Sequence, residues 1–147
     1  MYSHILIATD GSDVGQKGVD HGLALAKALG ARVLVLTVSE PFPASVSALA
    51  YAPSEAMLDD FESGQAKAAS ETLAAIKAEA GQAGVTAETM YVADAQPAEA
   101  ILAAAQSHQC DLIVMGSHGR RGLGRLVLGS KAYEVVSHGH IPVLVVR

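Results

Sequence analysis

The sequence predicts an α/β fold in which a doubly wound parallel sheet carries helices on both faces. Five short apolar runs alternate along the chain with segments of helical pattern. Runs that are apolar on both faces are typical of parallel strands covered by helices on each side, and regular strand–helix alternation favours right-handed crossovers. A chain of 147 residues suits a single domain, which we expect over residues 1–147.

The five predicted strands differ in how apolar they are. The first two read HILIA and ARVLVLTV, and the last two read DLIVM and PVLVV. The third reads AETMYV, is the least apolar, and is therefore expected at an edge of the sheet. The predicted strands cover residues 4–8, 31–38, 87–92, 111–115 and 142–146.

The first predicted helix has signals at both of its ends. Ser12 or Asp13 is suited to cap its start, and Gly30 is suited to the left-handed residue that follows its end near Leu29. Three prolines then come close together after the second strand. They predict an irregular loop over residues 39–53, which is suited to act as a mobile flap.

Three more helices are expected further along the chain. Ser54 begins a long one, rich in Ala, Glu and Lys, whose middle is weakened by Gly64, by about 1 kcal/mol relative to Ala. Pro97 fits the first position of the next helix, because the N–H that proline lacks would be unpaired there in any case. These helices are predicted to run from 54 to 81 or 84, over 97–107 and over 130–137.

The composition narrows the functional classes. A net charge of -5 disfavours a general nucleic-acid binder, because such binding depends on Lys and Arg that neutralise phosphates. The single cysteine, Cys110, excludes an intrachain disulfide and a cysteine-based zinc cluster, and we expect it in the core. No signal-like N-terminus and no apolar run of roughly 20 residues is found. We therefore expect a cytoplasmic protein with no membrane or nucleic-acid partner.

The most informative segment follows the fourth strand. Residues 116–131 hold five of the fourteen glycines and four of the ten Lys and Arg residues, and no acid lies between Leu112 and Tyr133. Glycines let main-chain N–H groups approach phosphate oxygens, and the helix expected from Ser130 adds unpaired N–H groups. This segment predicts an anion site; the alternative is a flexible surface loop made soluble by its arginines.

Familiar phosphate-binding motifs do not account for this segment. Gly124 and Gly129 have the spacing of a Walker A loop, but Ser130 and Lys131 are transposed and the intervening Leu-Val-Leu is bulky. No G-x-G-x-x-G follows the first strand, so the dinucleotide fingerprint is absent. The segment after the first strand, TDGSDV, also departs at three positions from the S-G-G-x-D-S loop of ATP pyrophosphatases.

A different pattern does match. Gly116-x2-Gly119-x9-Gly129-Ser130 resembles the G-x2-G-x9-G-[S/T] pattern of the ATP-binding branch of the universal stress protein family. The opening HILIATDGS, the segment DLIVMGSHG and the closing PVLVV also resemble that family, so the resemblance covers essentially the whole chain. It implies the strand order 3-2-1-4-5, with the switch point between the first and fourth strands, which is where ligands bind in open parallel sheets.

The resemblance also implies roles for residues at the ends of the strands. Asp10 would accept hydrogen bonds from the sugar hydroxyls of a bound nucleotide; its alternative role is to cap the following helix. Ala8 and Thr9 would line the adenine through main-chain contacts. Val38, at the end of the second strand, is similar to the position that contacts adenine in the family, although a valine there also suits the core.

The remaining implied contacts lie after the fourth strand. Met115 and Gly116 would lie under the ribose and α-phosphate, while Gly119, Gly129 and Ser130 would hold the phosphates. Further candidates are the side chains of His118 and Arg120, which either contact the ligand or face solvent, and Lys131, which stands where the family commonly has an apolar residue.

We expect, on this resemblance, an ATP-binding regulator of a stress response that is not an enzyme. ATP would carry Mg²⁺ on its phosphates, and a downstream protein, which the sequence does not identify, would read the nucleotide state. One alternative is a slow ATPase or phosphotransferase with His118 as its base; the other is a nucleotide-free dimeric adaptor. The last strand, from Pro142 to Val146, is an apolar edge that the family's habit of pairing would cover, so we expect a homodimer.

Overall fold

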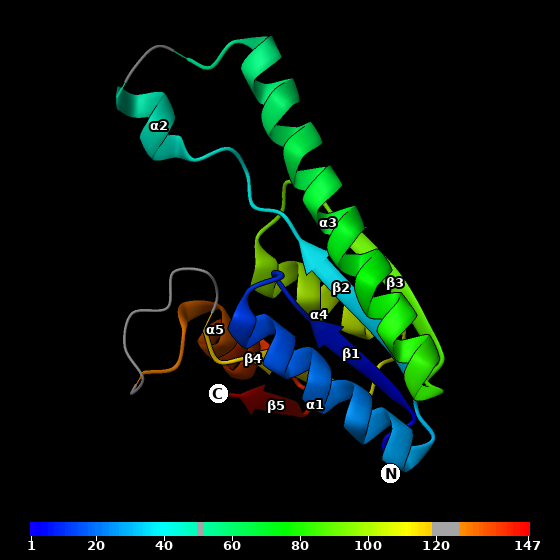
Figure 1. The fold of residues 1–147 in the computed structure, drawn as a ribbon. Coiled ribbons are helices and arrows are strands. Elements are labelled where there is room, and N and C mark those ends of the chain that lie inside the picture. The colour runs from blue at the N-terminus through cyan, green and yellow to red at the C-terminus, as the bar shows by residue number, and fades with distance from the viewer. Residues whose placement is uncertain (50–51, 119–126) are drawn as a thin grey trace.

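The computed structural model describes residues 1–49, 52–118 and 127–147. Its centre is one sheet of five parallel strands in the order β3-β2-β1-β4-β5, which confirms the predicted fold class and strand order (Figure 1). The least apolar strand, β3, is an edge, as expected. The strands are β1 (His4–Ala8), β2 (Arg32–Val38), β3 (Ala87–Val92), β4 (Leu112–Gly116) and β5 (Val143–Val146).

The helices form a layer on each face of the sheet. One hydrophobic cluster joins the sheet to α1 (Asp13–Leu29) and α3 (Glu55–Ala83), and a second joins it to α4 (Pro97–Ser107) and α5 (Ser130–His138). The first half of α3 extends past the end of the sheet (Figure 1). None of the helices in the described part of the chain combines the length and apolar character needed to cross a membrane.

The central strand β1 is buried on both of its faces. Ile5 and Ile7 belong to the cluster under α1 and α3, whereas Leu6 belongs to the cluster under α4 and α5. All three side chains are fully buried, as expected for a parallel strand between two helical layers. Cys110 lies in the second cluster, where burial raises the pKa of its thiol to about 11, so the thiol stays protonated at neutral pH.

The ends of α1 follow the predicted capping chemistry. Ser12, and not Asp13, is the cap: its side chain accepts a hydrogen bond from Gly15 N at 3.1 Å. Gly30 follows the helix with φ 65°, a left-handed conformation that glycine adopts without steric cost. The long helix α3 ends in the same way, between a serine cap at Ser54 and a left-handed glycine.

The segment predicted as irregular contains a short helix, so that prediction was wrong in part. α2 (Ala44–Leu49) begins directly after Pro43, and it lies away from the sheet, near the start of α3 (Figure 1). The prolines were interpreted as loop signals, but proline also suits the N-terminal end of a helix. Phe42 makes an edge-to-face ring contact with Phe61 of α3, at a centroid distance of 5.1 Å, which ties this segment to the long helix.

Asp111 joins β1 and β4 at the amino edge of the sheet. It accepts hydrogen bonds from Ser3 N and Ser3 Oγ, each at 2.8 Å, and from His4 N at 3.1 Å. Partial burial acts to raise the pKa of the carboxyl group, but these hydrogen bonds outweigh it and leave the pKa below its usual value. The ionised carboxylate therefore stabilises the folded state.

This arrangement predicts a loss of stability in acid. A group whose pKa is lower in the folded state stabilises the protein above its unfolded pKa, near 4, and the contribution disappears as the pH falls through the folded pKa. We expect Asp111→Asn to lower the free energy of unfolding at pH 7 by about 1 kcal/mol and to have almost no effect near pH 2. Urea unfolding at both pH values measures this difference. Asp59→Asn, on the exposed face of α3, is the control; equal losses for Asp111→Asn at both pH values would contradict the assignment.

Candidate functional site

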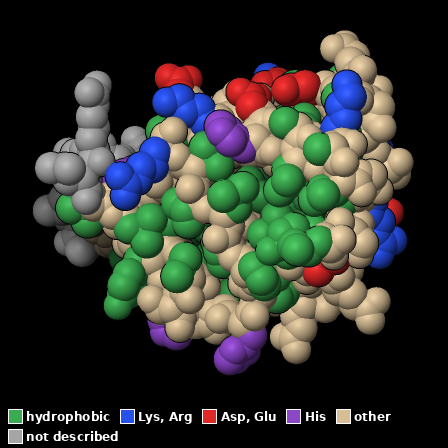
Figure 2. Space-filling model, turned by 90° about the horizontal axis from the view of Figure 1, so that it is seen from below, with side chains coloured by type: hydrophobic (Ala, Val, Ile, Leu, Met, Phe, Trp, Pro, Cys, Tyr) green, Lys and Arg blue, Asp and Glu red, His purple; other side chains and the backbone are tan. Residues whose placement is uncertain are grey.

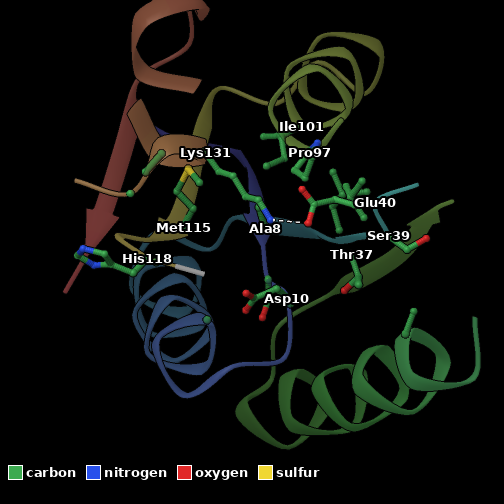
Figure 3. A pocket seen from close by; sticks show the side chains of 18 of the residues that line it. Ala8, Asp10, Thr37, Ser39, Glu40, Pro97, Ile101, Met115, His118 and Lys131 are labelled. Carbon is green, nitrogen blue, oxygen red and sulfur yellow. Dashed lines mark hydrogen bonds and ion pairs between the residues drawn. The ribbon is translucent and has the colours of Figure 1, made fainter. Parts of the chain in front are cut away.

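A cavity of about 650 Å³ opens at the carboxyl edge of the sheet, over the switch point between β1 and β4 (Figure 3). The ends of β1, β2 and β4 form its floor, and α3, α4 and the start of α5 form its walls. Gly119 and Arg120, two of the residues predicted from the sequence, lie outside the described residues. The other ten predicted residues all line the cavity: Ala8, Thr9, Asp10, Val38, Met115, Gly116, His118, Gly129, Ser130 and Lys131.

The side of the cavity that faces α4 and α5 is apolar. Leu36 and Val38 from β2, Met115 from β4 and Ile101 from α4 belong to or pack against the same hydrophobic cluster, together with Ala8 at the end of β1. Figure 3 shows Ile101 and Met115 on this side of the sheet edge. A surface of this kind suits a flat aromatic ring, which gains from leaving water but needs few polar contacts.

The main chain of Val38 supplies polar groups beside this apolar surface. Ser39 N donates to Val92 O of β3 at 2.9 Å, so the main-chain groups of the preceding residue, Val38, point to the opposite side, toward β1. The pairing of β1 with β2 closes with a bond from Thr9 N to Leu36 O at 3.0 Å. The N–H and C=O of Val38 therefore face the space beyond the end of β1, where they form an adjacent donor and acceptor.

Asp10 is held in place by the residue that caps α1. Its Oδ1 atom accepts hydrogen bonds from the Ser12 hydroxyl and from Ser12 N, the latter at 3.0 Å. The helix approaches closely at Gly15, where an added Cβ would lie 2.8 Å from both Asp10 Oδ1 and Thr9 Oγ1. Asp10 therefore positions the helix cap rather than serving as the cap. Gly15 was not predicted as a site residue; its signal in the sequence was a glycine in the first turn of a helix.

The first turn of α5 forms the opposite end of the cavity. Its first amides, those of residues 130–132, have no carbonyl within the helix to pair with, and no side chain of the described residues caps them. The positive end of the helix dipole thus faces the cavity, and the Ser130 hydroxyl lies beside it. The N–H of Gly129 is already used, because it donates to Ser117 O at 2.8 Å.

Lys131 crosses the mouth of the cavity to meet Glu40, just beyond the end of β2. Its Nζ atom lies 3.0 Å from Glu40 Oε2, and the two side chains are about half exposed (Figure 3). The ion pair links two segments that are 91 residues apart in the sequence. Glu40 was not predicted, since nothing local in the sequence indicates which residue a distant lysine will meet.

His118 lines the cavity but its ring turns away from it. The ring extends toward β5 in Figure 3, and Nδ1 lies 2.8 Å from Ser117 Oγ. The Nε2 atom is buried and has no hydrogen-bond partner among the described residues. In this conformation the imidazole does not face the cavity.

The charged side chains of the cavity are few. Within the described ranges, Asp10 and Glu40 are its acids and Lys131 is its only Lys or Arg. No group of three or more His, Cys, Asp or Glu side chains in those ranges is arranged to hold a metal ion. A ligand with several negative charges would thus meet the first turn of α5 and Lys131, which is paired with Glu40, at one end and the carboxylate of Asp10 elsewhere.

Comparison with known proteins agrees with this architecture. All of residues 1–147 match the sequence model of the universal stress protein family. The chain belongs to the universal stress protein family. Two universal stress proteins share about a third of its residues: one from Thermus aquaticus is 37% identical over the full length of both chains, and MJ0531 from Methanocaldococcus jannaschii is 35% identical over all of this chain and 83% of its own.

The same family relationship extends to solved structures. The structure of MJ0577, another Methanocaldococcus jannaschii universal stress protein, superimposes with a TM-score of 0.83 and 27% identity, covering 99% of this chain and 96% of its own. The layered sheet and its strand order are thus shared with a solved universal stress protein structure.

The close approach of Gly129 predicts the effect of adding a single methyl group. An added Cβ would lie 2.6 Å from Ser117 O, a main-chain atom that cannot move away cheaply. We expect Gly129→Ala to lower the free energy of unfolding by about 1–3 kcal/mol, measured by urea unfolding. The control is Gly64→Ala in the middle of α3, where nothing lies within 4 Å, and where we expect a gain of up to about 1 kcal/mol. Equal effects of the two substitutions would contradict the tight contact.

Proposed function

We propose that this universal stress protein binds ATP or a close adenine nucleotide in the cavity and acts in the cytoplasm as a nucleotide-dependent regulator of a stress response. The observation that carries the proposal is the chemical difference between the two ends of the cavity. One end offers an apolar wall beside the main-chain groups of Val38, and the other offers the uncapped first turn of α5 with Lys131. A base with a phosphate chain has this same polarity.

The ligand is oriented by this polarity. Adenine lies against Ile101, with its hydrogen-bonding edge directed to the N–H and C=O of Val38, and Met115 lies with Gly116 under the ribose and α-phosphate. The ribose hydroxyls donate to Asp10, and the phosphates reach the amides of residues 130–132. Gly129 and Gly116 contribute by letting neighbouring main-chain segments pack closely, because an added Cβ at either position would lie within 2.8 Å of a main-chain oxygen.

Adenine nucleotides are bound by other proteins of this fold. One universal stress protein has been solved in complex with cAMP (TM-score 0.68, 24% identity, covering 99% of this chain and 97% of that one). Another, from Archaeoglobus fulgidus, has been solved in complex with dAMP (TM-score 0.65, 20% identity, covering 99% and 98%). At these identities the two structures share the fold with this chain, and they make adenine nucleotides the first compounds to assay.

In this proposal any Mg²⁺ would be bound to the phosphates of the nucleotide and would enter the cavity with it. Phosphate oxygens and water would hold the ion, because the described residues offer no group of three or more His, Cys, Asp or Glu side chains that could do so. Glu40 is paired with Lys131, and its carboxylate would become available to such an ion once Lys131 turns to the phosphates.

Binding, rather than catalysis, is the activity we propose. Phosphoryl transfer requires a group that positions the attacking oxygen, and the ring of His118 points away from the cavity. A nucleotide-free adaptor is also disfavoured, because such a protein has no use for a preformed cavity of about 650 Å³ with an uncapped helix at one end. A downstream protein would read the state of the cavity.

We also propose a homodimer that pairs along β5. This strand forms the outer edge of the sheet, and Figure 2, which views the molecule from that side, shows hydrophobic side chains gathered across the middle of the face. Leu144 of β5 is 38% exposed, and Tyr133 and Val136 of α5 are 62% and 47% exposed. An unpaired apolar edge favours association, and pairing with a second copy would cover it.

ATP binding and its dependence on Lys131 test the function. We expect saturable 1:1 binding of ATP in isothermal titration. Lys131→Met should weaken ATP binding by roughly threefold to tenfold and AMP binding less, because AMP places fewer charges near the lysine. Glu40→Gln should strengthen ATP binding, since it releases Lys131 from its ion pair and removes a negative charge from the mouth.

Two outcomes would count against the proposal. The absence of saturable binding of any adenine nucleotide by the wild-type protein would end it. The second outcome is that the wild-type protein and Lys131→Met bind ATP with equal affinity, with no gain in Glu40→Gln. That result would refute the placement of the phosphates beside Lys131 at α5, but it would not refute nucleotide binding itself.

The dimer is tested by adding a charge to the exposed edge strand. We expect the wild-type protein to sediment as a dimer at micromolar concentration and Leu144→Lys to sediment as a monomer, because a lysine on an edge opposes strand pairing. Met57→Lys is the matched control: Met57 is also an exposed apolar residue, but it lies on α3, away from β5. A monomeric wild-type protein would refute the dimer.

A further inference from the structure

The cavity has a second side, toward α1 and α3, where hydroxyl and amide side chains lie among the apolar Phe61, Ala68 and Ala69 of α3. Thr37 shares a face of β2 with Val33 and Val35, which pack under α1 and α3, whereas Leu36 and Val38 face the other layer. Figure 3 shows Thr37 and Asp10 below the sheet edge, on the side of α3, with Lys131 and Ile101 above it. We call this side the polar lobe; its lining includes Thr37, Ser39, Gln65, Thr72 and Tyr91.

The hydroxyl group of Thr37 stands out within the polar lobe. The residue is only 8% exposed, and its Oγ1 atom is buried without a hydrogen-bond partner among the described residues. Neighbouring hydroxyls are paired: Thr9 Oγ1 accepts from Gly11 N at 3.2 Å, and Ser39 Oγ lies 2.7 Å from Tyr91 Oη. Because an unpaired buried hydroxyl destabilises a folded protein, one that lines a cavity points to a partner that arrives with the ligand.

The charges around the polar lobe limit what that partner is. Asp10 lies on this side, and within the described residues no Lys or Arg lines it, since Lys131 is on the opposite side and pairs with Glu40. A phosphate would therefore be repelled from the polar lobe. An uncharged group that donates through N–H or O–H suits both the carboxylate of Asp10 and the free acceptor sites of a threonine hydroxyl.

We propose that Thr37 is a specificity-determining residue whose Oγ1 atom hydrogen-bonds an amino or hydroxyl group at the nucleoside end of the ligand. The polar lobe then selects the nucleoside, while α5 receives the phosphates. This inference rests on the proposed function and specifies which end of the nucleotide the protein recognises. A site built to hydrogen-bond a polar group discriminates strongly against analogues that lack it.

A purely structural role for Thr37 predicts different behaviour. Threonine favours strands through its β-branched shape, and Val has nearly the same shape without the hydroxyl. If Thr37 only fills space, Thr37→Val leaves nucleotide affinity unchanged. On our proposal it weakens ATP binding by about tenfold, the order expected for one lost hydrogen bond, while the melting temperature of the free protein stays equal or rises.

The test is isothermal titration of ATP into the wild-type protein, Thr37→Val and Thr37→Ser. Thr37→Ser keeps the hydroxyl and should retain affinity within about threefold, a change of well under 1.4 kcal/mol. Thr89→Val is the matched control, because it removes a hydroxyl from the neighbouring strand β3 at a position outside the cavity. Its affinity for ATP should equal that of the wild type.

Two analogues identify the group that Thr37 contacts. One is 2′-deoxyATP, which lacks a ribose hydroxyl, and the other is purine riboside triphosphate, which lacks the amino group of adenine. For one analogue, Thr37→Val and the wild-type protein should have equal affinities. That analogue lacks the group that Thr37 contacts. Either result supports the inference and distinguishes the two sources.

Three results would overturn the inference. If Thr37→Val binds ATP and both analogues with the same affinity as the wild-type protein, the proposed role of Thr37 is refuted, but the proposed ATP binding is not. An equal loss in Thr37→Ser, which keeps the hydroxyl group, and in Thr37→Val, which removes it, would show that the hydroxyl group does not carry the effect. No binding of ATP by the wild-type protein would refute the proposed function and this inference together.

Discussion

Gly129 and Ser117 approach so closely that the direction of α5 is set by main-chain atoms. Gly129 N donates to Ser117 O at 2.8 Å, and Ser117 N donates to Val146 O at 2.7 Å, so α5, β4 and β5 meet at one residue. A side chain at Gly129 would not fit. These contacts do not depend on a ligand, so the first amides of α5 already face the cavity in the free protein. Ligand binding therefore carries no free-energy cost for ordering them.

The two sides of the cavity differ because neighbouring residues of a strand face opposite layers. Along β2, Leu36 and Val38 face the apolar layer under α4 and α5, while Thr37 faces α1 and α3. In most of the sheet both faces are buried by helices. At the switch point the helices diverge, so the same alternation produces an apolar wall on one side and a polar lobe on the other. The topology of the sheet thus produces a cavity that suits a ligand with one apolar part and one polar part.

The secondary-structure elements were predictable from local sequence patterns and the strand order from the family resemblance, whereas contacts between particular distant side chains were not predictable. The strands, the serine caps and the terminating glycines follow from nearest-neighbour chemistry, and the ends of β1 and β4 were expected at the site. The pairing of Glu40 with Lys131 depends on how two distant segments meet, which no local pattern encodes. Thr37 carried a weak signal: it is the only hydroxyl residue in the run VLVLTV, yet a threonine is ordinary in a strand.

In the proposed complex phosphate oxygens meet the first amides of α5, and amide chemical shifts report that contact directly. In ¹H–¹⁵N spectra recorded during separate titrations, ATP and inorganic triphosphate should shift the amide resonances of residues 130–132, whereas adenosine should leave them in place. Unchanged resonances at saturating ATP, or equal shifts with adenosine, would contradict the account.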